Sequence, residues 1–461
     1  MSIGLFINTN AGFRGITKTY IEFQNYFEIK SVSFCCIRQW VLRLGYGLMI
    51  QKVEKRSDWI YILDFSIQLG KERCLLILGV TRQSLVENGY ELKHHQVRVL
   101  DIFVQEHFDG EAVYQRLISV RNRTGIPYQI ISDKGNDVKK GVELFCNRNK
   151  QVIDIYDITH MIGICIKHRM ENDIRWLNLQ KDLCELTQQV KQSDVSFLRP
   201  IAISKKARWL NIKQEIEWLE DIYNYERRGD FSLICKGYKI KNYEEIFERN
   251  KGIFKNKYDE KRFFKELKDR VFEQIEDIPK LLENYGLMEK QNIETIDAGK
   301  ARFEEKFAVL NEHKTFFYEL KQLNTMAENI KGLIRNQGLS MNTLQAIEAE
   351  YDKLRYEWIQ QVFYDINNRL QKEHSKCGID QRPILCCSEI IESVFGKFKM
   401  KAKQTVGGIY ETVLSIVLFC SNLTEDLIQE ILTSVKMSDV DNWFRGMAGV
   451  SNLAKRRIAF C

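Results

Sequence analysis

The sequence predicts an α/β core built on a mixed five-stranded sheet with flanking helices. A large all-α insertion interrupts this core, and a small helical region precedes it. Strand-like and helix-like segments follow one another in the order β-β-β-α-β-α-β between residues 59 and 158. From there to about residue 375, strand patterns nearly vanish and long charged amphipathic segments replace them. An amphipathic helix that carries two glutamates follows near residue 390.

The composition indicates a folded chain with a slight basic excess. Its 461 residues exceed one ordinary domain, and 44% hydrophobic and 11% aromatic residues are enough for real cores. The 69 basic residues against 62 acidic ones give a net charge of +7, which is compatible with a polyanionic partner but is weak support alone.

The sequence offers no signal for secretion or for a membrane span. It opens without a charged segment followed by an apolar run and a cleavage site, and no stretch of 18 uninterrupted apolar residues occurs. The 12 cysteines include no C-x-x-C pair, so we expect free thiols in a reducing cytoplasm. A zinc site would need His374, Cys377, Cys386 and Cys387, whose spacing is poor, and buried or surface thiols are the alternative.

The first 55 residues are predicted to contain two short helices. One covers residues 20–29, and the second starts after a capping Ser31 or Ser33 and stops at Gly45. Two helices with a tight connection are typical of a helix-turn-helix. Residues 1–55 are therefore predicted to bind DNA, and a plain helical hairpin packed on the next domain is the alternative. The proposed DNA contacts lie on the second helix: Arg38, Gln39 and Arg43.

The sheet is predicted from five short apolar runs. Short polar turns between the first three favour an antiparallel meander, and the later strands, separated by helices, favour parallel crossovers. The predicted divisions are 56–160 for the first part of the core, 161–375 for the helical insertion and 376–461 for the second part of the core. The expected strands are 59–67, 73–81, 97–106, 128–132 and 151–158, with helices over 110–124 and 137–147.

Two aspartates occupy equivalent places in this pattern. Asp64 lies inside the first strand, where a carboxylate is costly to bury unless it is paired or binds a metal. Asp133 directly follows the fourth strand. The first and fourth strands are neighbours in this order, so both carboxylates are expected at one edge of the sheet. Hard cations such as Mg²⁺ take oxygen ligands of this kind, although either aspartate alone could be a turn or capping residue.

A third carboxylate is predicted on the helix near residue 390. Ile391, Val394, Phe395 and Phe398 follow the spacing of one buried helical stripe. At about 100° per residue, Glu392 lies on the shoulder of this stripe and Glu389 faces away from it. Glu392 is therefore the expected ligand, and Lys399 shares its side of the helix, where it could meet a phosphate.

These residues carry a resemblance to a known family. The segments ILDFS with Asp64, ISDKGNDV with Asp133 and IIESVFGKFK with Glu392 resemble the three acidic motifs of DDE-type transposases, which have an RNase H-like fold. YDITH, with Asp157 and His160, is similar to the C/D-x-x-H motif of members with a helical insertion, as in bacterial insertion-sequence, hAT and Mutator-like groups. The separation of 392 − 133 = 259 residues agrees with such an insertion. Cys165-x-x-His168 also fits the motif, so the choice between the two histidines stays open.

The resemblance implies a function, a cofactor and partners. It implies a DNA transposase in which Asp64, Asp133 and Glu392 hold two Mg²⁺ ions, which Mn²⁺ can replace, with His160 as a further site residue. Double-stranded DNA at transposon ends and target would be the partner, and the chain would act as a homodimer or higher oligomer in a prokaryotic, nucleoid-associated setting. The alternatives are a domesticated or inactive DNA-binding copy, and an RNase H-like nuclease that does not transpose.

A basic segment in the insertion is the last candidate site. SKKARWLN places Lys205, Lys206 and Arg208 beside Trp209, which suits phosphate contacts and stacking on a base. The resemblance implies the stacking role, because related transposases use an aromatic of the insertion in this way. The alternative is that Trp209 belongs to the core of the insertion.

Overall fold

The computed structural model describes residues 1–65, 72–191, 198–201, 209, 212–228, 261–263, 265–266, 303–378, 382–402 and 412–448. The chain divides into two compact units, each described here by itself. Unit 1 comprises Met1–Met161, Ile330–Glu350 and Ile366–Cys461, and unit 2 comprises Ile162–Asn329 and Tyr351–Asp365. Residues 330–350 and 366–375, which the prediction assigned to the insertion, therefore pack with unit 1.

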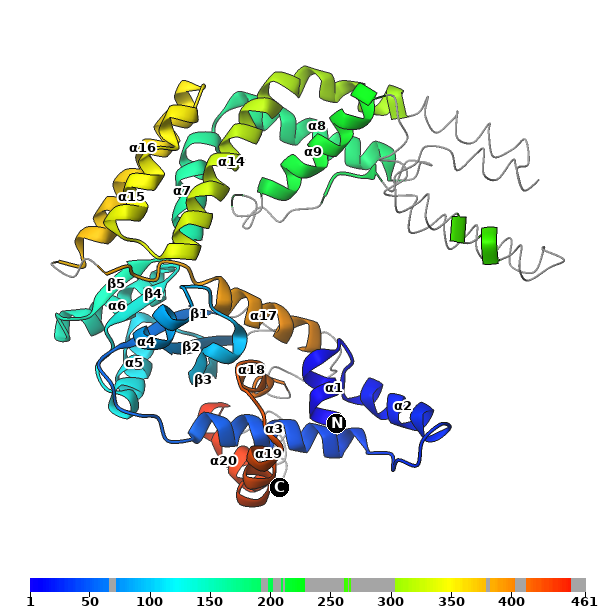
Figure 1. The fold of residues 1–461 in the computed structure, drawn as a ribbon, viewed down its shortest axis with the longest axis vertical. Helices are drawn as coiled ribbons and strands as arrows, with labels where there is room; N and C mark the ends of the chain where they lie inside the picture. The colour runs from blue at the N-terminus through cyan, green and yellow to red at the C-terminus, as the bar shows by residue number, and fades with distance from the viewer. Residues whose placement is uncertain are drawn as a thin grey trace, which may run out of the picture. The chain divides into compact units, whose positions relative to one another are not determined.

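Unit 1 is built on a mixed five-stranded sheet with the order β3-β2-β1-β4-β5 (Figure 1). β1 pairs antiparallel with β2, and β2 pairs antiparallel with β3, whereas β1–β4 and β4–β5 are parallel. This order confirms the predicted RNase H-like fold. The strands are β1 Trp59–Phe65, β2 Arg73–Thr81, β3 Arg98–Gln105, β4 Gln129–Ser132 and β5 Ile153–Tyr156.

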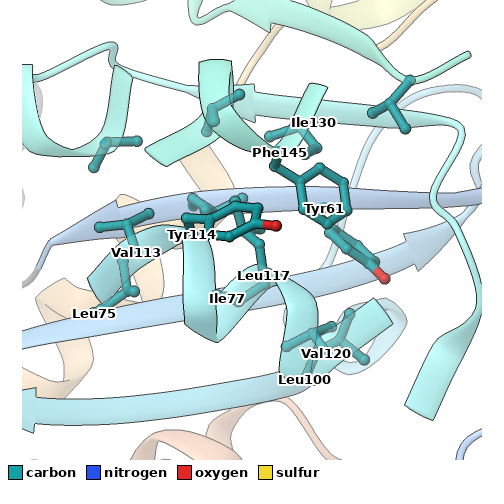
Figure 2. Close-up of a cluster of buried hydrophobic side chains, with 14 of the residues drawn as sticks. Tyr61, Leu75, Ile77, Leu100, Val113, Tyr114, Leu117, Val120, Ile130 and Phe145 are labelled. Atoms are coloured by element: carbon teal, nitrogen blue, oxygen red, sulfur yellow. The ribbon is translucent and has the colours of Figure 1, made fainter. Parts of the chain in front are cut away.

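Helices α5 (Gly110–Thr124) and α6 (Asn136–Arg148) cover one face of the sheet. Alternate residues of the strands point to this face and meet the apolar stripes of both helices in one buried core (Figure 2). Asp109 starts α5, because its carboxylate accepts a hydrogen bond from the Ala112 N–H at 2.8 Å. The members of this core include Tyr61, Leu63, Leu75, Ile77, Leu100, Val113, Leu117, Val120, Ile130, Val142 and Phe145.

The opposite face packs against helices from both ends of the chain. α17 contacts β1, while α3, α18 and α20 contact β3. α3 also touches α1, α2 and α19, so it is the central helix of this layer (Figure 1). The bounds are α1 Ser2–Asn8, α2 Phe13–Gln24, α3 Phe34–Ile50, α17 Glu389–Ala402, α18 Ser415–Phe419, α19 Glu425–Ser434 and α20 Met437–Ala448.

The predicted N-terminal helices need two corrections. The first of the two predicted helices lies at Phe13–Gln24 and not at 20–29, and α1 precedes it. Ser33 caps the second helix as predicted, but Gly45 does not end it. A Cβ at Gly45 would lie 2.3 Å from the Leu414 carbonyl oxygen, so this glycine permits a close helix contact and is not a stop signal.

The remaining described helices complete the two units. The connection from β2 to β3 is longer than a polar turn, because it contains α4 and η1. Unit 2 is helical in its described part and buries Trp176, Leu320 and Ile359. No described helix is long and apolar enough to cross a membrane. The other bounds are α4 Arg82–Glu87, η1 His94–Gln96, α7 Ile158–Met170, α8 Ile174–Val190, α9 Ile212–Arg228, η3 Ala308–His313, α14 Lys314–Gln337, α15 Met341–Glu348, η4 Tyr351–Lys353 and α16 Glu357–Ser375.

Candidate functional site

Strand register aligns three aspartates at one edge of the sheet. In the parallel strands β1, β4 and β5, Leu63 pairs with Ser132 and Ser132 pairs with Tyr156. The residue after each of these is an aspartate, so Asp64, Asp133 and Asp157 occupy one level on adjacent strands. Neighbouring strands lie about 4.8 Å apart, and side chains alternate between faces. All three therefore follow the face of Ile62, Ile131 and Ile155, and α17 contacts β1 on this side of the sheet.

Both burial and neighbouring groups shift the pKa of the Asp64 carboxyl. Its Oδ1 accepts a hydrogen bond from the Phe65 N–H at 2.6 Å. Burial and, after it, the negative charge of Asp133 raise the pKa of Asp64, and Glu392 adds a smaller contribution in the same direction. The Phe65 N–H and the His160 charge lower the pKa, and the net value is about 7. Asp133 and Glu392 therefore both lie within electrostatic reach of Asp64.

Asp133 lies in a turn with a constrained backbone. Its Oδ1 accepts a hydrogen bond from the Gly135 N–H at 2.9 Å. Between them, Lys134 has φ +53°, a left-handed conformation that is uncommon outside glycine and is often found at functional sites. The Lys134 ammonium forms an ion pair with Asp154 at 2.9 Å, which holds this turn against β5. The sequence prediction overlooked Lys134.

Glu392 lies in the first turn of α17, whose apolar stripe is buried as predicted. The residue as a whole is exposed, but its carboxyl is partly buried, and this burial raises the pKa of Glu392. The charges of Asp157 and Glu389 also raise this pKa, whereas those of His160 and Lys399 lower it. Glu389 is instead paired with Arg335. This geometry favours Glu392 over Glu389 as the third acidic residue, and it places the Lys399 charge near Glu392.

Asp157 is a buried carboxylate with four hydrogen bonds. It is 1% exposed. Its Oδ1 accepts from the His160 backbone N–H at 3.0 Å and lies 3.3 Å from His160 Nδ1. Its Oδ2 accepts from the Ser388 N–H at 2.6 Å and from the Ser388 hydroxyl at 2.5 Å. Burial alone would raise the pKa of Asp157, but the hydrogen bonds from His160 and Ser388 lower it, so the group is an anion.

His160 belongs to this acidic edge. Burial lowers its pKa, but the hydrogen bond and charge of Asp157, with Asp133 and Glu392, outweigh this effect and raise the pKa to about 9. His168 lies in the last turn of α7 and is exposed. The structure therefore favours His160 over His168 as the motif histidine.

The donor types at this edge suit Mg²⁺, which prefers carboxylate oxygens. Asp64, Asp133 and Glu392 could supply them, because the negative charges of Asp133 and Glu392 both act on the Asp64 carboxyl. Among the described residues, however, no three His, Cys, Asp or Glu side chains are gathered closely enough to hold a metal ion. Binding would thus require the acidic side chains to draw together. The same result gives no support to the zinc alternative, and Cys377 and Cys386 are buried free thiols.

The structure does not support a standard helix-turn-helix. Residues 25–33 separate α2 from α3, whereas the motif has a turn of about 3–4 residues. Arg43 donates hydrogen bonds to the carbonyl oxygens of Val435, at 2.7 Å, and Leu432, so it holds the end of α19 inside unit 1. These bonds give its guanidinium partners within unit 1, and its role as a DNA contact stays a prediction. Arg38 is half-buried and Gln39 is exposed on the first half of α3, and their roles stay predictions.

The predicted insertion residues are only partly described. Lys205, Lys206 and Arg208 lie outside the described residues. Trp209 is half-buried, and its ring centroid lies 5.2 Å from that of the buried Trp176. This packing within unit 2 favours the alternative that Trp209 is a core residue, because its ring already has an aromatic partner.

The prediction also missed Ser388, which the structure shows between the sheet and the Glu392 helix. A serine directly before an amphipathic helix is a capping signal, so the segment SEIIES contained the information. Its partner Asp157 could not be read from the sequence, because 231 residues separate the two.

Comparisons with known proteins add one distant structural likeness. No protein-family model matches the chain, and no curated protein matches it. Among solved structures, the Drosophila P element transposase strand transfer complex aligns with 92% of this chain and 92% of its own, with a TM-score of 0.38 and 11% identity. At this TM-score the likeness supports no inference about mechanism, and the RNase H-like fold rests on the order and directions of the strands.

Proposed function

We propose that this chain is a DDE-type DNA transposase, an RNase H-like enzyme that cleaves DNA at transposon ends and joins it to a target. The observation that carries the proposal is the alignment of Asp64 and Asp133 on adjacent strand ends, with Glu392 close enough to raise the pKa of Asp64. A nuclease of this class needs converging carboxylates on a rigid sheet edge. The order of these residues along the chain agrees with the resemblance seen in the sequence.

In this proposal, Asp64, Asp133 and Glu392 would hold two Mg²⁺ ions. When bound, such a pair supplies activation of the attacking water or 3′-hydroxyl and stabilisation of the leaving oxygen. Lys399 shares the side of α17 that carries Glu392, and its ammonium would contact a phosphate beside the scissile bond. His160, held by Asp157, would keep a positive charge near the same phosphate, since its pKa is raised to about 9.

The partners follow from the chemistry. The substrate would be double-stranded DNA, and the joining of two transposon ends to one target implies a homodimer or a higher oligomer on DNA. A chain that binds this DNA in Mg²⁺ or Mn²⁺ without cutting it would instead be a domesticated or inactive copy.

A cleavage assay with two matched variants tests the proposal. The purified protein is incubated with Mg²⁺ and a plasmid that carries the DNA flanking its own gene, and strand breaks are mapped. Glu392→Gln removes one hard ligand at constant size, so cleavage should fall by orders of magnitude while DNA binding persists. Glu389→Gln breaks only an exposed pair with Arg335, so cleavage should persist. Equal cleavage by wild type and Glu392→Gln would place the active site elsewhere.

A further inference from the structure

One carboxylate lies at the start of two helices that both carry residues of the proposed site. Asp157 directly precedes α7, and its Oδ1 accepts from the backbone N–H of His160 in the first turn. Its Oδ2 accepts both donors of Ser388, the residue directly before α17. The Ile391 N–H in turn donates to the Ser388 carbonyl at 2.9 Å, so Ser388 begins the first turn of α17. Asp157 thus caps α7 directly and α17 through Ser388.

The surrounding contacts attach the same segment to the sheet. The Ile158 N–H donates to the Cys386 carbonyl at 2.9 Å, and the buried Gln129 amide donates to the Leu385 carbonyl. The Asp157 N–H donates to the Ser132 carbonyl at 2.9 Å, one residue before Asp133. Backbone and side-chain hydrogen bonds therefore link the Asp133 strand, through Asp157, to the start of the Glu392 helix.

We infer that Asp157 is a positioning residue that sets where Glu392 stands relative to Asp64 and Asp133. The inference rests on the proposed function, because it assigns Asp157 to the geometry of that same acidic site. Glu392 comes from a segment far along the chain, and α17 has to be held at a fixed height above the sheet edge for its first turn to reach the two strand ends. An anion at a helix start also interacts favourably with the helix dipole, so the carboxylate form is suited to this task. Asp157 itself need not touch metal or substrate.

Hydrogen exchange on the intact chain, without metal or DNA, tests the tether directly. Asp157→Ala removes all four bonds, so amides of residues 388–392 should exchange roughly 10- to 100-fold faster, as for loss of a charged hydrogen-bond acceptor. Ser388→Ala removes one donor and keeps the backbone one, so a smaller acceleration of about threefold is expected at the same amides. His160→Ala keeps the His160 backbone N–H and should leave exchange in α17 unchanged. If Asp157→Ala does not fold, Ser388→Ala carries the test.

A metal titration separates positioning from simple stability. Mn²⁺ binding to the intact protein, followed by electron paramagnetic resonance well below the melting temperature, should weaken roughly 10- to 100-fold in Asp157→Ala, as for other groups that orient metal ligands. Saturating Mn²⁺ should then restore cleavage by Asp157→Ala but not by Glu392→Gln, because only the former keeps all three ligands. Glu392→Gln should lose Mn²⁺ affinity with unchanged exchange.

Two results would overturn the inference. One is unchanged exchange at 388–392 in both Asp157→Ala and Ser388→Ala. The other is accelerated exchange with unaltered Mn²⁺ affinity, which would make Asp157 a structural cap only. If the wild-type chain binds no Mn²⁺ and cuts no DNA, the proposed function fails while the exchange result still reports on the tether, so the two failures are distinguishable.

Discussion

Asp64→Asn is expected to stabilise the metal-free protein while abolishing the DNA cleavage that we propose for it. Burial and the neighbouring carboxylates raise the pKa of Asp64 from 3.8 to about 7. In the unfolded chain the group ionises near its ordinary pKa, so the folded state keeps a proton that the unfolded state has released. The free energy of unfolding therefore falls as pH rises from about 4 to about 7, and it stays lower above that range. Asparagine has no such charge and escapes this loss.

The size of the effect follows from the pKa. Each pH unit between 3.8 and about 7 corresponds to about 1.4 kcal/mol. At pH 8 and without divalent cations, Asp64→Asn should be more stable than wild type by up to about 4 kcal/mol. At pH 4.5 the gain should be only about 1 kcal/mol. Added Mg²⁺ should stabilise wild type at pH 8, because binding balances the charge, and should have a much smaller effect on Asp64→Asn.

Denaturation at the two pH values, in a chelator and in Mg²⁺, measures these differences. Asp58→Asn is the matched control, because the hydrogen bond from Arg56 lowers the pKa of Asp58. Its removal should lower stability at pH 8, opposite in sign to Asp64→Asn. The reasoning is refuted if Asp64→Asn is no more stable than wild type at pH 8, or if its gain is the same at pH 4.5.

Four further substitutions test packing within the two units. Gly45→Ala places a Cβ 2.3 Å from the Leu414 carbonyl oxygen and should destabilise unit 1 by several kcal/mol. Gly396→Ala is the control, because its Cβ would meet nothing within 4 Å, and it should stabilise α17 by up to about 1 kcal/mol. Thermal melts of the two variants measure these changes. Lys401→Met removes the ammonium that donates to the Thr9 and Ala11 carbonyl oxygens at 2.6 and 2.8 Å. Limited proteolysis near α1 should then accelerate roughly tenfold. An unchanged rate would contradict the role of Lys401 in holding this segment. Trp209→Ala should destabilise unit 2 by roughly 2 kcal/mol, which is less than the ~3–5 kcal/mol expected for a fully buried tryptophan. An unchanged thermal melt together with impaired cleavage would instead support stacking of Trp209 on a base.

The parts of the fold that local patterns determine were predictable. β2 was predicted at its observed bounds, because a continuous apolar run between polar residues is typical of a strand covered on both faces. The position of Asp64 and Asp133 at the same edge of the sheet could be predicted from strand order, because neighbouring parallel strands end at the same edge. Their predicted roles as metal ligands, and that of Glu392, stay predictions.

The failures concern contacts between distant segments. Glycine is typical of a helix end, and only the close approach of Leu414 explains why Gly45 lies inside a helix. Arg43 resembles an exposed basic residue of a recognition helix, yet its partners come from α19. A sequence pattern describes the face of a helix, but it does not identify what lies against that face. For the same reason Ser388 was overlooked, although its capping position was visible.

The discontinuity of unit 1 has a consequence for synthesis of the chain on the ribosome. The sheet strands are complete by residue 156, but α17 to α20, which cover one face around α3, follow only after the residues of unit 2. Until then, the apolar side of β1 and of α3 lacks its cover, so a nascent chain exposes a surface prone to aggregation or to chaperone binding. Glu392 also arrives 259 residues after Asp133 (392 − 133). A partly synthesised chain therefore holds two of the three acidic residues, and the order of translation itself delays assembly of the acidic site until unit 2 has been made.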